Sequence, residues 1–131
     1  MGVFLKVIGS GLNPCPEPYE EPYADFSPTR RPRQIHEGDH LVLYAAGGRK
    51  RVFAVARVTS ELKVSDYPEW PHRLDIEYLV NVSPADSVPI DKVSLERELG
   101  KLVRRQSYIR LTMEEYNRAA ALLEEAAGNN S

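Results

Sequence analysis

The fold is decided by two apolar stretches in the middle of the chain, Gly38-Asp39-His40-Leu41-Val42-Leu43-Tyr44 and Val52-Phe53-Ala54-Val55-Ala56-Arg57-Val58. In the second stretch every other residue, from Val52 to Val58, falls on one face, and this period of two is typical of a β-strand. Residues 47–50, Gly-Gly-Arg-Lys, lie between the two stretches and supply a flexible turn. Two strands joined across a glycine turn predict a β-hairpin.

Three more strands are predicted on either side of this hairpin. The run from Met1 to Ile8 is apolar except for Lys6, and we interpret it as the first strand. Residues 73–82 alternate most cleanly, which is typical of a half-buried strand. Residues 106–111 are expected to form the last strand.

Two helices are expected from their start signals. Asp91 is expected to cap a short helix that ends near Leu99. The sequence Thr112-Met113-Glu114-Glu115 is a capping box, and it opens a final helix over about 113–127. Together these elements predict an α+β domain, a small curled β-barrel of about five to six strands with two to three helices outside it.

A proline-rich segment interrupts this pattern between the first strand and the hairpin. Six of the ten prolines lie between Asn13 and Pro32, where they exclude a helix or a central strand. The segment also contains Tyr19, Tyr23 and Phe26, which are unusual in a free linker. We therefore expect residues 12–34 to be a loop that lies over the body of a single domain. That domain spans 1–128, and 129–131 form a frayed tail.

Composition limits the classes of function. The chain has 131 residues and a formal net charge of −2, which excludes a polybasic coat. Nine bases and five acids fall within residues 30–73, so this middle third is basic inside an acidic protein. Such an island is suited to an anionic partner, although surface arginines could also gather there without a function. No apolar run is long enough to span a membrane, and a cytoplasmic monomer is expected.

Catalytic and metal-binding patterns are scarce. His36 and His40 are four residues apart, but Gly38 between them indicates a turn, and only Glu37, Asp39 or His72 could add a third zinc ligand. A solvated turn is the alternative interpretation. Cys15 is the only cysteine, so an internal disulfide is excluded, and no base near it indicates a nucleophile. We therefore expect a binding protein without metal or cofactor.

Aromatic residues give the better indication of function. Trp70 lies in a polar loop between two prolines, where a core tryptophan is not expected. Nucleobases are bound by stacking on aromatic faces, and a base drawn out of its duplex needs such walls together with hydrogen-bond partners for its edge. The alternative is that Trp70 covers the end of the barrel while the loop tyrosines hold the loops in place.

The order of the elements resembles that of EVE domains. Residues 38–44 have the form GDxxxxY and precede an apolar strand, as in the central hairpin of that family. Pro68-Glu69-Trp70-Pro71-His72-Arg73 and Arg105-Gln106-Ser107-Tyr108-Ile109-Arg110-Leu111 are also similar to it. The resemblance covers most of residues 3–124. EVE domains belong to the PUA-like superfamily with the YTH and ASCH domains, so the resemblance implies a PUA-like β-barrel.

The resemblance also implies recognition of a modified nucleobase without catalysis. DNA is favoured over RNA, and the base is expected to be 5-methylcytosine or 5-hydroxymethylcytosine, flipped into an aromatic pocket. The expected pocket residues are Trp70, Tyr67, Tyr19, Tyr23, Tyr44, Ser10, Gly11, Asp25 and Asp66. The expected phosphate-binding residues are Arg30, Arg31, Arg33, Arg49, Lys50, Arg51, His72 and Arg73. The alternatives are an RNA-binding module, for N6-methyladenine or unmodified RNA, and an ASCH-like hydrolase that uses Asp66 or Lys63.

Overall fold

A single mixed β-sheet forms the centre of the protein in the computed structural model, which describes residues 1–10, 12–16, 18–47 and 49–128. Among these residues the strand order is β2-β6-β4-β3-β1-β8, with β5 beside β6 and β7 beside β4. The strands are β1 (Val3–Ile8), β2 (Tyr23–Phe26), β3 (His40–Ala45), β4 (Arg51–Val58), β5 (Lys63–Val64), β6 (His72–Asn81), β7 (Val88–Pro89) and β8 (Tyr108–Arg110). The helices are α1 (Ile90–Val93), α2 (Leu99–Leu102) and α3 (Met113–Gly128), with a short 3-10 turn over Pro84–Asp86.

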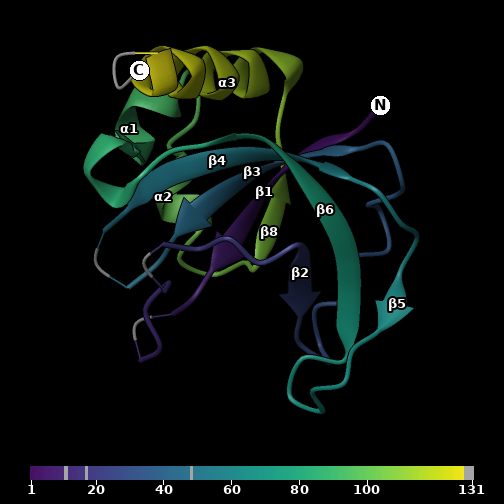
Figure 1. Ribbon diagram of the computed structural model, residues 1–131. Coiled ribbons are helices and arrows are strands. Elements are labelled where there is room, and N and C mark those ends of the chain that lie inside the picture. The colour runs from purple at the N-terminus through teal and green to yellow at the C-terminus, as the bar shows by residue number, and fades with distance from the viewer. Residues whose placement is uncertain (11, 17, 48, 129–131) are drawn as a thin grey trace.

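The predicted hairpin is confirmed and forms the middle of the sheet. Strands β3 and β4 are antiparallel, with Leu41 opposite Ala56 and Leu43 opposite Ala54. Strand β1 pairs with β3 in parallel and with β8 in the antiparallel sense. The sheet curls strongly along β6, so that β2 lies beneath it (Figure 1). The predicted α+β class, with a curled sheet and helices outside, is therefore confirmed.

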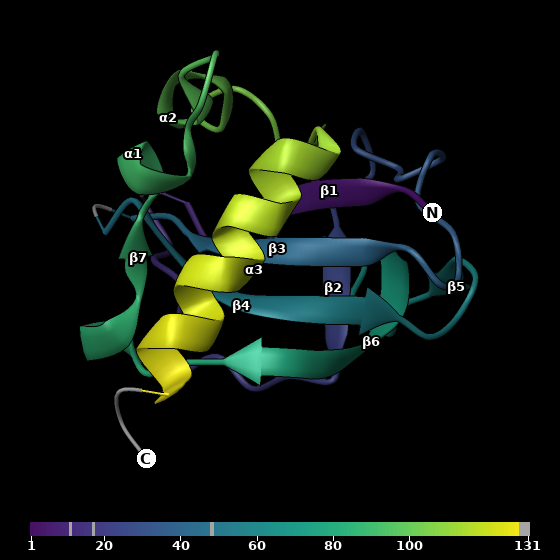
Figure 2. The same cartoon turned by 90° about the horizontal axis from the view of Figure 1, so that it is seen from above.

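Helix α3 covers one face of the sheet and crosses the strands obliquely (Figure 2). The capping box at its start is confirmed, because Thr112 N donates to Glu115 Oε1 at 2.8 Å and Glu115 N donates to Thr112 Oγ1 at 3.1 Å. Nδ1 of His40 lies 2.6 Å from the hydroxyl of Tyr116 and ties β3 to the helix. None of the helices within the described ranges combines the length and apolar character that crossing a bilayer requires.

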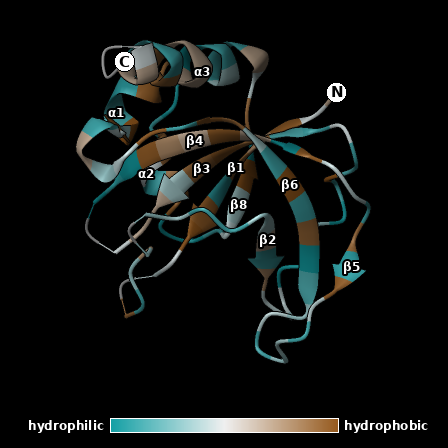
Figure 3. Ribbon diagram, viewed as in Figure 1, coloured by the Kyte–Doolittle hydropathy of each residue, from teal (hydrophilic) through white to brown (hydrophobic). Residues whose placement is uncertain are grey.

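Both faces of the hairpin are buried, although its sequence alternation predicted two distinct faces. Phe53 and Val55 of β4 are as inaccessible as Ala54 and Ala56. The hydrophobic colouring is concentrated on β1, β3 and β4 (Figure 3). The reason is that α3 covers one face, and the proline-rich segment covers part of the other through the ring of Tyr19, which lies 6.0 Å from that of Phe53.

The proline-rich segment contains a strand that its sequence did not predict. Residues of β2 pair with β6, with Ala24 opposite Leu74 and Phe26 opposite His72. It is an edge strand, which is the position that proline-flanked strands can occupy. The hydroxyl of Tyr19 donates to the carbonyl oxygen of Tyr23 at 2.9 Å. Tyr19 and Phe26 thus pack the segment against the sheet.

The prediction of one helix from Asp91 to Leu99 is wrong. The structure has two four-residue helices there, α1 and α2, and the first is preceded by Pro89 and not capped by Asp91. Ser94 separates them, because its backbone is extended and its hydroxyl accepts the backbone N–H of Leu99 at 3.1 Å.

Candidate nucleic-acid interface

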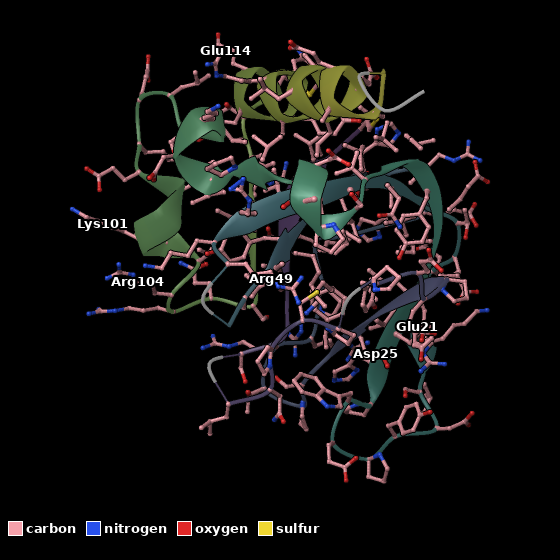
Figure 4. All side chains as sticks on the ribbon, turned by 60° about the vertical axis from the view of Figure 1, so that its left-hand side comes forward. Glu21, Asp25, Arg49, Lys101, Arg104 and Glu114 are labelled. Atoms are coloured by element: carbon pink, nitrogen blue, oxygen red, sulfur yellow. The ribbon has the colours of Figure 1, made fainter. Side chains whose placement is uncertain are left out.

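A cavity of about 670 Å³ is lined in part by β2, which lies on the opposite side of the sheet from helix α3 (Figure 1). Its walls come from the end of β1, from β2, from the end of β3 and the turn that follows it, and from the segment between α2 and β8. The volume is in the range of pockets that hold small organic ligands. Figure 4 shows Glu21 and Asp25, which line this cavity, on the side of the sheet away from Glu114 of α3.

Strand β2 supplies one wall through its alternation. Ala24 and Phe26 are fully buried in the core, so Tyr23 and Asp25 face the other way and line the cavity. Trp70, the only tryptophan of the chain, also lines the cavity, and it is 48% exposed. An exposed indole at the rim of a cavity is available for stacking.

Asp25 is fixed by Arg73 of β6. The guanidinium donates from Nε to Oδ1 at 2.7 Å and from Nη2 to Oδ2 at 2.9 Å, and both side chains are largely buried. The same guanidinium lies 3.6 Å from the centre of the Tyr23 ring. The hydrogen bonds to Asp25 raise the pKa of Arg73. This arrangement holds a carboxylate in one orientation at the cavity wall.

Lys6 is a buried cation that also lines the cavity. Its side chain is 3% exposed and its Nζ lies 4.3 Å from the centre of the Phe26 ring. Burial lowers the pKa of Lys6 from 10.5 to about 8, and the negative charge of Asp25 opposes part of that change.

Other polar groups of the cavity remain uncharged near neutral pH. Burial raises the pKa values of Tyr19 and Tyr44, so both hydroxyl groups keep their protons. Oγ of Ser107 is buried and, within the described ranges, is the one such side-chain oxygen or nitrogen without a hydrogen-bond partner. The cavity therefore combines hydroxyl groups with one fixed carboxylate and one buried amine.

Four cations that line the cavity are exposed and so mark its mouth: Arg30, Lys50, Arg104 and Arg105. Lys50 is, within the described ranges, the only residue other than glycine with a positive φ, at 56°. Strained backbone of this kind is often found at binding sites. The arrangement is suited to a ligand that carries negative charge outside the cavity.

Two glycines let the segment 13–15 lie close to the cavity wall. A Cβ on Gly9, where φ is 87°, would lie 2.5 Å from the nitrogen of Cys15, and a Cβ on Gly47 would lie 2.7 Å from the Cα of Pro14. Side chains at these positions would push the segment outward. The close approach places Ser10 at the cavity, with its hydroxyl accepting the N–H of Asn13 at 3.0 Å.

Most of the predicted pocket residues line the cavity. The ones that do are Trp70, Tyr19, Tyr23, Tyr44, Ser10 and Asp25. Tyr67 and Asp66 do not line it. They lie in a turn in which the backbone N–H of Trp70 donates to the Tyr67 carbonyl, and both side chains are exposed. Gly11 lies outside the described residues.

The predicted phosphate-binding residues lie in several different places. Only Arg30 and Lys50 line the cavity. Arg31 and Arg33 lie beside other, smaller hollows, and Arg49 donates to the Cys15 carbonyl. Arg51 donates to Ser87 Oγ at 3.1 Å, Arg73 bonds Asp25, and His72 is half-buried on β6.

Sequence reasoning did not assign Lys6, Arg104, Arg105 or Ser107 to the site. Lys6 had a visible signal, since it is the one charge in an otherwise apolar strand. Arg104 and Arg105 had none, because only the pairing of β8 with β1 brings their segment to the cavity.

The histidines and the cysteine do not line this cavity. Nδ1 of His36 lies 3.2 Å from Glu61 Oε1, and His40 bonds Tyr116. Within the described ranges no group of three side chains is arranged to hold a metal ion. Cys15 is buried, with Sγ 3.5 Å from the Pro16 carbonyl oxygen.

Solved structures with the same architecture include two bacterial proteins and a YTH domain. Protein Rpa0253 from Rhodopseudomonas palustris is 14% identical, with a TM-score of 0.61 over 95% of this chain and 94% of that one. Protein Atu2648 from Agrobacterium tumefaciens is 14% identical, with a TM-score of 0.63 over 96% and 93%. The Mmi1 YTH domain, solved in complex with RNA, is 10% identical, with a TM-score of 0.62 over 98% and 81%.

The chain has a YTH-like fold. The sequence itself matches no family model and no curated protein. The fold supports the PUA-like architecture that the EVE resemblance implies. Because the sequence matches no family model, membership of the EVE family stays a prediction.

Proposed function

We propose that the chain is a nucleic-acid-binding module that takes one unstacked base into the cavity. The observation that carries the proposal is the composition of this one cavity. It combines an exposed tryptophan and a tyrosine at its walls, buried polar groups inside, and four cations at its mouth. Aromatic walls suit the flat base, the polar groups suit its edge, and the cations suit the neighbouring phosphates.

The finer proposal is that the base is a modified cytosine in DNA, either 5-methylcytosine or 5-hydroxymethylcytosine. It is supported by the EVE resemblance and by the carboxylate of Asp25, which can accept a hydrogen bond from an exocyclic amine. RNA is the second candidate, and it is supported by the likeness to the Mmi1 YTH domain, whose structure holds RNA.

We propose binding without catalysis. The residues offered for a hydrolase, Asp66 and Lys63, lie outside the cavity. Lys63 Nζ bonds Asp75 Oδ2 on the neighbouring strand, and Asp66 is exposed. The cavity therefore supports a reader of bases better than it supports the hydrolase.

Replacing Trp70 with alanine is expected to weaken binding of a short single-stranded oligonucleotide. Base stacking on an aromatic side chain contributes about 1–3 kcal/mol, so the dissociation constant should rise by about five-fold to a hundred-fold. Fluorescence anisotropy of a labelled oligonucleotide measures this change. Tyr67→Ala is the matched control, because it removes an exposed aromatic from the same loop but not from the cavity, and it should cost less. Unchanged affinity of Trp70→Ala would remove Trp70 from the site.

Removing two mouth cations together is expected to reduce the salt dependence of binding. Each phosphate contact contributes about 0.7 to the slope of log affinity against log salt for single strands. The Arg104→Gln, Arg105→Gln double variant should therefore lower the slope by up to about 1.4. The Arg31→Gln, Arg33→Gln double variant removes the same charge away from the cavity, and an equal effect from it would contradict the assignment of the mouth.

A further inference from the structure

Two polar groups of different kinds line the cavity, on β1 and β2. The first is the amine of Lys6, which, while it is protonated, donates hydrogen bonds and accepts none. The second is the carboxylate of Asp25, which can only accept them while it is ionised. They are near enough for the negative charge of Asp25 to act on the pKa of Lys6, and both side chains line the cavity.

Lys6 is not used by the fold as buried cations usually are. A buried lysine is normally paired with a carboxylate, because an unpaired charge inside a protein is costly. Here the negative charge that acts on Lys6, the carboxylate of Asp25, is bonded through both oxygens to Arg73, and Lys6 Nζ lies against the face of the Phe26 ring. Within the described ranges the buried side-chain polar atom without a partner is Ser107 Oγ, and it lines the same cavity as Lys6. Buried polar groups without partners indicate a missing partner, and a ligand in the cavity would meet both groups.

We propose that Lys6 and Asp25 together select an amino base, meaning adenine or cytosine with or without a methyl group, against the keto bases. This inference rests on the proposed function and names the ligand edge that the same site reads. Adenine and cytosine both present an exocyclic amine beside a ring nitrogen that accepts. Asp25 accepts from the amine and Lys6 donates to the ring nitrogen.

Keto bases present the opposite pattern. Uracil, thymine and hypoxanthine carry an N–H where the amino bases have the accepting ring nitrogen, and a carbonyl where those have the amine. In the cavity that N–H would face the donor of Lys6, and the carbonyl would face the carboxylate of Asp25. Buried polar groups that are left unpaired in this way are the strongest source of discrimination between similar ligands.

The charge of Lys6 gives the selection a dependence on pH. The pKa of Lys6 is about 8, so the amine changes charge in an accessible range. The tyrosines that line the cavity, Tyr19, Tyr23 and Tyr44, do not, because burial raises their pKa values. The other charged side chains that face the cavity are the carboxylates of Glu21 and Asp25 and the cations Arg30, Lys50, Arg104 and Arg105.

The test compares short single-stranded oligonucleotides that differ at one base, cytosine against uracil and adenine against hypoxanthine, at pH 6.5. Trp70 fluorescence reports occupancy of the cavity, because it is the only tryptophan. The wild-type protein is expected to prefer each amino base by about tenfold or more. Lys6→Met should lose the preference, while Lys101→Met, which removes an exposed lysine on α2, should keep it.

A pH series on the cytosine oligonucleotide gives a second readout that needs no variant. Affinity of the wild-type protein should be constant below pH 8 and fall above it by up to about tenfold for each pH unit, because the amine loses the charge that strengthens its hydrogen bond and makes it a donor only. Equal affinity for amino and keto bases, or a flat profile up to pH 9.5, would overturn this inference and leave the proposed function standing. Failure to bind any oligonucleotide would overturn both.

Discussion

Replacing Lys6 with methionine is expected to make the folded protein more stable at pH 7, by about 2–3 kcal/mol. The pKa of Lys6 is lowered from 10.5 to about 8 by burial, and each pH unit of that difference corresponds to about 1.4 kcal/mol. Methionine keeps an unbranched chain in the same space and places sulfur against the ring of Phe26. Thermal or chemical unfolding of both proteins measures the gain.

The same cause predicts the pH dependence of stability. Between pH 8 and 10.5 the unfolded chain binds more protons than the folded protein at Lys6, so the free energy of unfolding of the wild-type protein should rise with pH in that window. The unfavourable contribution is fully present below pH 8 and is lost as the pH approaches 10.5. The difference between Lys6→Met and the wild type should therefore shrink as the pH rises. A variant that is less stable at pH 7, or a constant difference, would contradict the assignment of Lys6 as a buried unpaired cation.

Replacing Asp25 with alanine is expected to destabilise the protein by about 2–4 kcal/mol. The change leaves the Arg73 guanidinium without its carboxylate in a setting where both side chains are less than a fifth exposed, at 19% and 18%. It also removes the negative charge that supports Lys6. Chemical unfolding at pH 7 measures the loss. The control is Glu77→Ala, whose carboxylate lies 3.3 Å from Arg57 Nη2 with both side chains about half exposed, and it should cost less than about 1 kcal/mol.

A double variant separates the two effects of Asp25. In the Lys6→Met background Asp25→Ala should cost less than in the wild-type protein, because methionine needs no nearby negative charge. If Asp25→Ala costs no more than Glu77→Ala, the ion pair does not stabilise the cavity wall. If the cost is the same in both backgrounds, the coupling between Asp25 and Lys6 is absent.

The central sheet and the last helix could be predicted because each has one dominant periodicity. Residues 3–8, 51–58 and 72–81 form strands where alternation or an apolar run indicated them, and the capping box at Thr112 begins α3. Strand β2 could not be predicted, since its four residues lie among prolines and gain their structure from β6, about fifty residues further along the chain.

The candidate site could be predicted only where single residues were unusual in their surroundings. Trp70 and Tyr23 were noticeable as aromatics among prolines, and both line the cavity. Lys6 was noticeable as a charge in an apolar strand, but its position beside Asp25 depends on how β2 lies beneath the sheet. Arg104 was hidden, because pairing between β1 and β8 over a long sequence separation brings it to the mouth.

The most direct test of the account is a titration that follows Trp70 fluorescence at fixed salt. The probes are duplex DNA with cytosine, 5-methylcytosine or 5-hydroxymethylcytosine at one position, and RNA with adenine or N6-methyladenine at one position. The account predicts saturable quenching, because a base enters the cavity beside Trp70, and the tightest binding for a probe that carries a modified base. No change in fluorescence and no binding with any of the five probes would contradict it.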